Sequence, residues 1–145
     1  MFVSLQNQGA LYAVLNLENG SSVATRVRAA TTSRMRRIGL KGIERLAEGC
    51  GLWIAPTEAI HTFGLKMHLD VVFLDSKLRV RKLVSGLAPR RFSICIAATS
   101  VLELRAGTIR ETNTKVGDRL QFALAPENPY LVRTLRPGSL EASCT

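Results

Sequence analysis

Chemically versatile side chains are concentrated between residues 51 and 75. This stretch holds both histidines of the chain, His61 and His68, and the acid Asp70. A histidine beside a carboxylate is the arrangement that orients a general base or a metal-bound imidazole. Two adjacent strands could bring His61 and Asp70 into such a pair. We therefore expect a polar ligand-binding site around a glycine bend, formed by His61, Thr62, Lys66 and Asp70.

A structural role for His61 is the main alternative. A buried histidine that donates to a carbonyl or to Asp70 satisfies its own hydrogen bonds, and no nucleophile stands at a matching spacing. The spacing of His61, His68 and Asp70 also matches no helix-borne metal motif. Asp75 stands five residues after Asp70, so on one strand the two carboxylates would point to opposite faces. We therefore assign no catalytic residue and expect neither a metal nor another cofactor.

An excess of arginine is the other unusual feature. The chain carries a formal net charge of +9, and 15 of its 20 basic residues are arginine. Because a guanidinium group binds phosphate or carboxylate through two parallel hydrogen bonds, this excess favours an anionic partner. The basic residues gather in two runs, between residues 26 and 45 and between residues 77 and 91. The candidate anion-binding side chains are Arg34, Arg36, Arg37, Arg79, Arg81, Arg90 and Arg91.

Three functions are compatible with these features. The first is a non-enzymatic or accessory module whose polar site near His61 and Asp70 binds a small anionic ligand or an acidic partner. The second is a basic protein that binds nucleic acid through its arginine clusters, although a basic surface without such a partner also accounts for them. The third is a hydrolase-like enzyme centred on His61 and Asp70.

Short apolar alternations predict the elements that must position these side chains. Strands or extended pieces are expected at residues 11–17, 23–29, 51–54, 60–63, 69–74, 79–84, 92–96, 101–104 and 119–124, with a tight hairpin turn at 75–78. A helix capped by residues 31–33 should break near Gly39, with a further turn over 43–47, and a second helix should cover 108–114. The fold class is α+β and β-rich: a compact bent sheet or small barrel of about eight short strands with two short helices.

Length, cysteines and hydropathy bound the class of protein. The 145 residues favour a single domain, with a core of about residues 10–124 and a loosely held tail at 125–145. The three cysteines, roughly 45 to 50 residues apart, fit neither a disulfide framework nor a zinc site, so reduced thiols are expected. No apolar run predicts a membrane span, and no signal peptide is expected. A cytoplasmic location follows.

Three motifs in this order resemble the core signature of a known family. They are Gly51-Leu52-Trp53-Ile54-x-Pro56, Ile60-His61-Thr62-Phe63 and the run from Leu69 to Asp75. Further likeness, over roughly Thr25 to Phe122, comes from Val101-Leu102-Glu103-Leu104 and Val116-Gly117-Asp118-Arg119-Leu120. The chain is in these respects similar to the uncharacterised bacterial and archaeal family called domain of unknown function 192. The resemblance implies a small β-rich single domain with no established enzymatic activity.

Two departures from the family pattern stand near the expected site. Thr57 follows Pro56 where the family usually has a cysteine. Where the family usually has phenylalanine, methionine and arginine, this chain has Gly64, Leu65 and Lys66. A thiol-based activity is therefore not expected at this point, and Lys66 keeps the positive charge without the planar fork of arginine.

Overall fold

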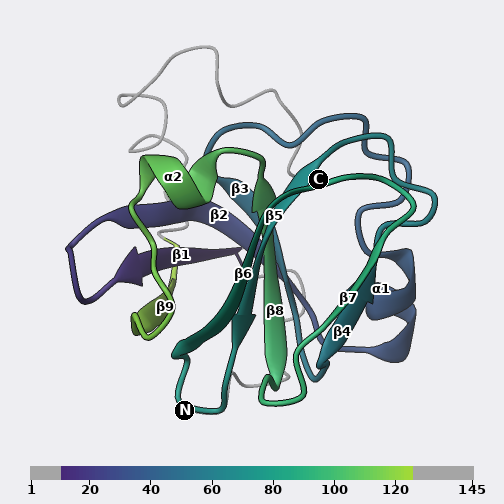
Figure 1. The fold of residues 1–145 in the computed structure, drawn as a ribbon. Coiled ribbons are helices and arrows are strands. Elements are labelled where there is room, and N and C mark those ends of the chain that lie inside the picture. Colours follow the sequence, from purple (N-terminus) through teal and green to yellow (C-terminus); the bar gives the residue numbers. More distant parts are fainter. Residues whose placement is uncertain (1–10, 126–145) are drawn as a thin grey trace.

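Nine strands and two short helices follow one another in the computed structural model, which describes residues 11–125 (Figure 1). The strands are β1 (Leu11–Asn16), β2 (Ser22–Ala30), β3 (Cys50–Ile54), β4 (Ala59–His61), β5 (Leu69–Leu74), β6 (Val80–Leu87), β7 (Phe92–Ile94), β8 (Ser100–Arg105) and β9 (Leu120–Leu124). The helices are α1 (Ser33–Ile38) and α2 (Thr108–Glu111). The predicted β-rich α+β class is confirmed, with nine strands rather than about eight.

Seven of the strands form one curled sheet. Their order is β6-β5-β8-β3-β2-β1-β9, and β2 and β3 are its parallel pair. The two outer strands approach each other where Arg79 pairs with Arg119 in an isolated bridge. Two backbone hydrogen bonds support this closure: Val80 N donates to Asp118 O at 2.8 Å, and Leu120 N donates to Leu78 O at 2.9 Å. The predicted bent sheet or small barrel is therefore confirmed.

The hairpin predicted at 75–78 forms, and a second hairpin joins β1 to β2. The β1–β2 pair is antiparallel, and its turn passes through Gly20, whose φ of +74° is one that glycine adopts without strain. The β5–β6 pair is also antiparallel, and Asp75 organises its turn. The Asp75 Oδ1 atom accepts hydrogen bonds from Lys77 N at 2.9 Å and from Arg79 N at 3.0 Å. This local side-chain bonding is the reason that the turn is readable from the sequence.

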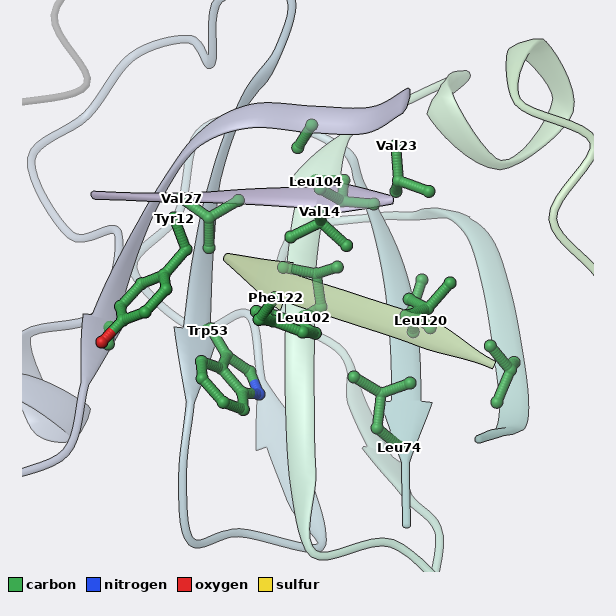
Figure 2. Close-up of a cluster of buried hydrophobic side chains, with 14 of the residues drawn as sticks. Tyr12, Val14, Val23, Val27, Trp53, Leu74, Leu102, Leu104, Leu120 and Phe122 are labelled. Atoms are coloured by element: carbon green, nitrogen blue, oxygen red, sulfur yellow. The ribbon is translucent and has the colours of Figure 1, made fainter. Parts of the chain in front are cut away.

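The inner face of the curled sheet holds the first of two hydrophobic cores. Its side chains come from strands at both ends of the sheet as well as from the middle, and they converge as Figure 2 shows. Trp53 stacks on Phe122 with 4.0 Å between ring centroids, and the ring of Tyr12 meets Trp53 edge-on at 6.0 Å. Because β9 supplies Phe122 and β3 supplies Trp53, this contact fastens the far edge of the sheet across the core.

The outer face of the same strands carries the second core. Alternate residues of β3, β5 and β8, such as Leu52, Val71 and Val101, point to this side, because successive side chains of a strand face opposite ways. The chain segments around α1 and the small β4–β7 sheet cover them (Figure 1). Leu40 and Ile60 are the buried contributions from these covering segments. The space between α1 and β4 is where the site described below lies.

The first helix agrees with its prediction and the segments beyond it do not. Thr32 caps α1 by accepting from Met35 N at 3.1 Å, and the helix ends at Gly39 with a φ of +49°. The turn expected over residues 43–47 is not helical, since Gly42 and Gly49 on either side of it bend the chain at positive φ. The second helix is also shorter than predicted, with four residues in α2.

The cysteines behave differently from one another. Cys95 is a free, half-buried thiol. Cys50, buried at the start of β3, is disulfide-bonded, so the expectation of reduced thiols throughout is wrong. Spacing along the chain does not report distance in the fold, which is why the pattern misled. The predicted tail falls largely outside the described residues. Within them, no helix has the length and apolar character needed to cross a membrane.

Candidate functional site

A cleft of about 170 Å³ opens on the outer face between α1 and β4. Its lining includes three side chains of positive charge, Arg36, Arg37 and Lys41, together with His61. Glu103 is the one acidic residue in this lining. The cleft therefore combines a basic wall with a single carboxyl group.

Helix α1 presents the two arginines because they occupy its last turn. The Nη1 atom of Arg36 donates to Thr31 O at 2.8 Å and to Ala55 O at 3.4 Å. Arg36 thus ties the start of the helix to the end of β3, and it has a structural role as well as a charge. The side chain of Arg37 is exposed and makes no hydrogen bond or ion pair within residues 11–125. Arg37 is therefore available to a ligand.

Lys41 and His61 line the cleft from the chain segments next to α1 and β4. The Lys41 side chain lies over the bend at Gly64, where an added Cβ would be 3.9 Å from Lys41 Cε. Gly64 has a φ of +84°, which glycine adopts without strain, and a Cβ there would make only ordinary van der Waals contact with the lysine stem. His61 is exposed on β4, and its ring lies 5.7 Å from that of Phe63 between centroids. Both side chains lie where a ligand could reach them.

Glu103 is buried at the base of the cleft with 3% of its surface exposed. It stands on β8 opposite Leu52 of β3 and Val71 of β5. Burial raises the pKa of Glu103 to about 7, because desolvation disfavours the charged form. No ion pair within 4 Å joins it to the basic side chains among the described residues. Glu103 can therefore hold or release a proton near neutral pH.

Three of the four predicted ligand-binding residues, Thr62, Lys66 and Asp70, do not line this cleft. Thr62 is fully buried; its hydroxyl donates to Ala88 O at 2.6 Å and accepts from Arg91 N at 2.8 Å. It therefore fastens the loop before β7 onto the end of β4. Lys66 forms a loose pair with Glu44 at 4.0 Å, and both side chains are largely exposed. Such a pair contributes little to stability.

The predicted pairing of His61 with Asp70 does not occur. The two residues lie on strands of different sheets, and Asp70 is buried on β5. Its carboxylate accepts from Gly86 N at 2.9 Å, from Gly107 N at 3.1 Å and from Ile109 N at 2.8 Å. Asp70 thus joins β6 and the start of α2 to β5. This geometry gives no support to an enzyme centred on His61 and Asp70.

The candidate anion-binding arginines are distributed over several elements. Arg36 and Arg37 line the cleft, whereas Arg34 is exposed on the same helix without lining it. Arg79 donates to Gly117 O at 3.3 Å, and Arg81 pairs with Asp75 at 3.4 Å. The remaining two, Arg90 and Arg91, are exposed in the loop before β7.

Sequence reasoning did not select Lys41 or Glu103 for this site. Lys41 was one of several basic residues in a run, and only the fold singles it out. Glu103 carried a readable signal, since it is the one charged residue in the otherwise apolar run from Val101 to Leu104. Charged residues are rarely fully buried without a partner, so this position invited a functional interpretation.

The described residues contain no group of three histidine, cysteine, aspartate or glutamate side chains that could hold a metal ion. The cleft itself offers electrostatic attraction from its basic wall, with hydrogen bonding and proton exchange at Glu103.

Comparison with solved structures identifies the same fold elsewhere. A protein of unknown function from Novosphingobium aromaticivorans DSM 12444 superposes with a TM-score of 0.67 at 20% identity, covering 77% of this chain and 83% of the other. A protein described as a putative transcription regulator from Sinorhizobium meliloti 1021 gives a TM-score of 0.69 at 21% identity, covering 78% and 92%. At these identities the likeness concerns the fold alone.

Sequence comparison gives the family. No curated protein matches the chain significantly. The family model of domain of unknown function 192, described as "Uncharacterized ACR, COG1430", matches residues 14–122, which include every strand from β2 to β8 and both helices. The chain therefore belongs to this uncharacterised family.

Proposed function

We propose that this protein binds a small anionic ligand in the cleft between α1 and β4. The observation that carries the proposal is the charge of the lining: Arg36, Arg37 and Lys41 face a space in which Glu103 is the one acid. His61 adds a further donor at the wall. Arg37 and Lys41 make no ion pair within the described range, so their charges are available to a bound anion.

The volume of the cleft supports a small ligand. About 170 Å³ corresponds to the space of roughly six water molecules in the liquid. Sites for larger organic ligands typically measure about 300 Å³ or more. A carboxylate or phosphate of a few carbon atoms fits this range, whereas a nucleic-acid strand would need a groove open along its length.

A thermal-shift and NMR screen tests the proposal. The probes are acetate, propionate, lactate, inorganic phosphate and glycerol 3-phosphate, titrated into uniformly ¹⁵N-labelled protein at low ionic strength. We expect saturable amide shifts at residues 39–41 and at His61. A probe at 100 times its Kd should stabilise the fold by about 2.7 kcal/mol.

Matched variants locate the binding. Arg37→Gln and Lys41→Gln should each weaken binding several-fold, because each removes one charge from the lining. Arg34→Gln and Lys66→Gln remove the same charge from exposed side chains that do not line the cleft, so they should leave the Kd nearly unchanged. Arg36 is a poor choice for this comparison, since its guanidinium also holds backbone carbonyls.

Two results would contradict the proposal. One is the absence of any saturable shift with all five probes. The other is an equal loss of affinity in Arg34→Gln and Arg37→Gln, which would indicate a response to net charge rather than a site. If a labelled oligonucleotide then bound with a steep salt dependence, electrostatic binding of nucleic acid would replace small-anion binding as the proposed function.

A further inference from the structure

Two buried carboxyl groups stand on neighbouring strands of the large sheet, on opposite faces, and they differ in how they are satisfied. Asp70 on β5 is 1% exposed and accepts three backbone hydrogen bonds. Glu103 on β8 is 3% exposed, and its side chain has no hydrogen-bond or ion-pair partner among residues 11–125. Asp70 pairs in register with Leu104, the neighbour of Glu103. The same sheet thus holds one buried carboxyl group whose hydrogen bonds are made and one that has no partner in the described part of the chain.

An unpartnered buried carboxyl group is costly. Leaving a buried polar group without a hydrogen bond costs on the order of 1–3 kcal/mol, and more when the group is charged. Native proteins satisfy the large majority of such groups, and the exceptions call for a specific explanation. Glu103 lines the cleft rather than a sealed interior, so a ligand in the cleft can supply the missing partner.

The charged and titratable groups around Glu103 come from each element that packs over its face. Arg36 and Arg37 belong to α1, Lys41 follows this helix, and His61 comes from β4. Arg28 of β2 shares the cross-strand row of Leu52 and Glu103, and it lines an adjoining hollow of about 160 Å³. None of these side chains forms an ion pair with Glu103 within the described range.

The proton on Glu103 determines which hydrogen bond it can make. With a pKa raised to about 7 by burial, the carboxyl group is neutral over much of the physiological range below that value. A neutral carboxyl group donates one hydrogen bond, whereas a carboxylate only accepts. A charged Glu103 would repel an anionic ligand held by the basic wall. A neutral Glu103 can instead donate a hydrogen bond to it.

We infer that the ligand is a small hydroxy or oxo acid, whose anionic group meets Arg37 and Lys41 and whose hydroxyl or carbonyl oxygen accepts a hydrogen bond from neutral Glu103. This inference rests on the proposed function, which requires the anionic group alone. It adds a second polar group to the ligand and makes Glu103 the residue that selects for it. Binding then holds the Glu103 proton in place, so affinity falls when the pH rises past neutrality.

Matched probes isolate the second polar group. Lactate and propionate differ by one hydroxyl group, as do 1-phosphopropan-2-ol and propyl phosphate, and the comparison of the two pairs reveals which anionic group the wall prefers. The Kd of each probe is measured by amide shifts between pH 5.5 and 8.5. We expect the hydroxylated member of the preferred pair to bind about fivefold more tightly at pH 6.5, the factor that one net hydrogen bond supplies.

Two substitutions at Glu103 test its role. Glu103→Gln keeps a donor that cannot titrate, so it should preserve the preference for the hydroxylated carboxylate and abolish the weakening above neutral pH. Glu103→Leu removes the donor, so both members of a pair should bind equally. The carboxylate probes are used for the pH series because their own ionisation is complete over this range. His61→Gln is the control for the neighbouring imidazole: it changes a side chain of the wall but keeps Glu103, so the weakening above neutral pH should remain.

The outcomes separate this inference from the proposed function. Equal binding of both members of each pair to the wild-type chain overturns the inference and leaves anion binding intact. A preference or a pH dependence that survives in Glu103→Leu also overturns it. If Glu103→Leu does not fold, the loss of pH dependence in Glu103→Gln decides the matter alone. Absence of binding by all four probes overturns the inference, and the proposed function fails with it only if the five probes of the first screen do not bind either.

Discussion

Asp70 holds the amide of Ile109 with a hydrogen bond of 2.8 Å across 39 positions of sequence. The same carboxylate also accepts from Gly107 N, so it binds the first turn of α2 to β5, the neighbour of the edge strand β6. Asp70, which the sequence suggested as one half of a catalytic pair, therefore anchors the four-residue helix α2 to the sheet. Such a helix is too short to be stable alone and depends on anchors of this kind.

Replacing Asp70 should therefore cost stability. Asp70→Ala leaves three backbone donors without their acceptor, and we expect the free energy of unfolding to fall by about 3 kcal/mol. Chemical denaturation followed by circular dichroism measures this loss, and hydrogen exchange at Ile109 reports the anchor itself. Glu58→Ala, at an exposed position, is the control and should change stability by less than about 0.5 kcal/mol. Equal stability of the two variants would refute the anchoring role.

The stability of the protein should depend on the ionisation of Glu103. Its pKa in the folded chain is raised from 4.5 to about 7, so the folded state keeps a proton that the unfolded state loses. The contribution of Glu103 to the free energy of unfolding is therefore fully present below about pH 4.5, and it is lost as the pH rises through about 7. The total loss is roughly 3 kcal/mol, from about 1.4 kcal/mol per pKa unit.

Glu103→Gln provides the comparison. Glutamine stays neutral at every pH, so its stability relative to the wild-type chain should increase between pH 5 and pH 8. Denaturant titrations at several pH values measure the difference between the two chains. Parallel pH profiles would show that Glu103 ionises at the same pH in the folded and unfolded states.

Gly51 should not tolerate a side chain. An added Cβ would lie 2.8 Å from the backbone O of Glu103 and 3.0 Å from Leu104 Cδ2. Because a backbone atom in a central strand cannot easily move, we expect Gly51→Ala to cost about 1–3 kcal/mol and to shift the amide resonances of Glu103 and Leu104. Gly20→Ala strains a turn with nothing within 4 Å, so it should destabilise without moving those two resonances.

The stack of Trp53 on Phe122 can be followed by fluorescence. Trp53 is the single tryptophan of the chain, so its emission reports this contact without interference. Phe122→Leu should lower stability by about 1–2 kcal/mol and alter the emission of the folded protein. Phe92→Leu, at a residue that is 62% exposed, should leave both unchanged. An unaltered spectrum in Phe122→Leu would indicate that the two rings do not stack in solution.

Local signals in the sequence were sufficient for the strands and turns. The Asp75 turn and the Thr32 cap each depend on hydrogen bonds between residues two to four positions apart, so their residue types predict them. The alternation along β8 likewise predicts a strand. These features need no knowledge of distant parts of the chain.

The site depended on pairings that no local pattern encodes. His61 and Asp70 are nine positions apart, yet they lie in different sheets. The parallel pairing of β2 with β3, together with the antiparallel pairing of β3 with β8, determines that Glu103 faces α1. Long-range register of this kind decides which of the many basic residues surround one carboxyl group. The sequence could therefore predict a basic surface but not which basic side chains line the cleft.

Successive side chains of β8 point to opposite faces of the large sheet. Leu102 and Leu104 fill the interior of the curl, and Glu103 between them looks out to the cleft. Because the pleat separates the two sides, Glu103 can be exchanged without repacking Leu102 and Leu104 on the inner side. An engineer could therefore change the chemistry of the cleft at this one position and keep the interior of the curled sheet as it is.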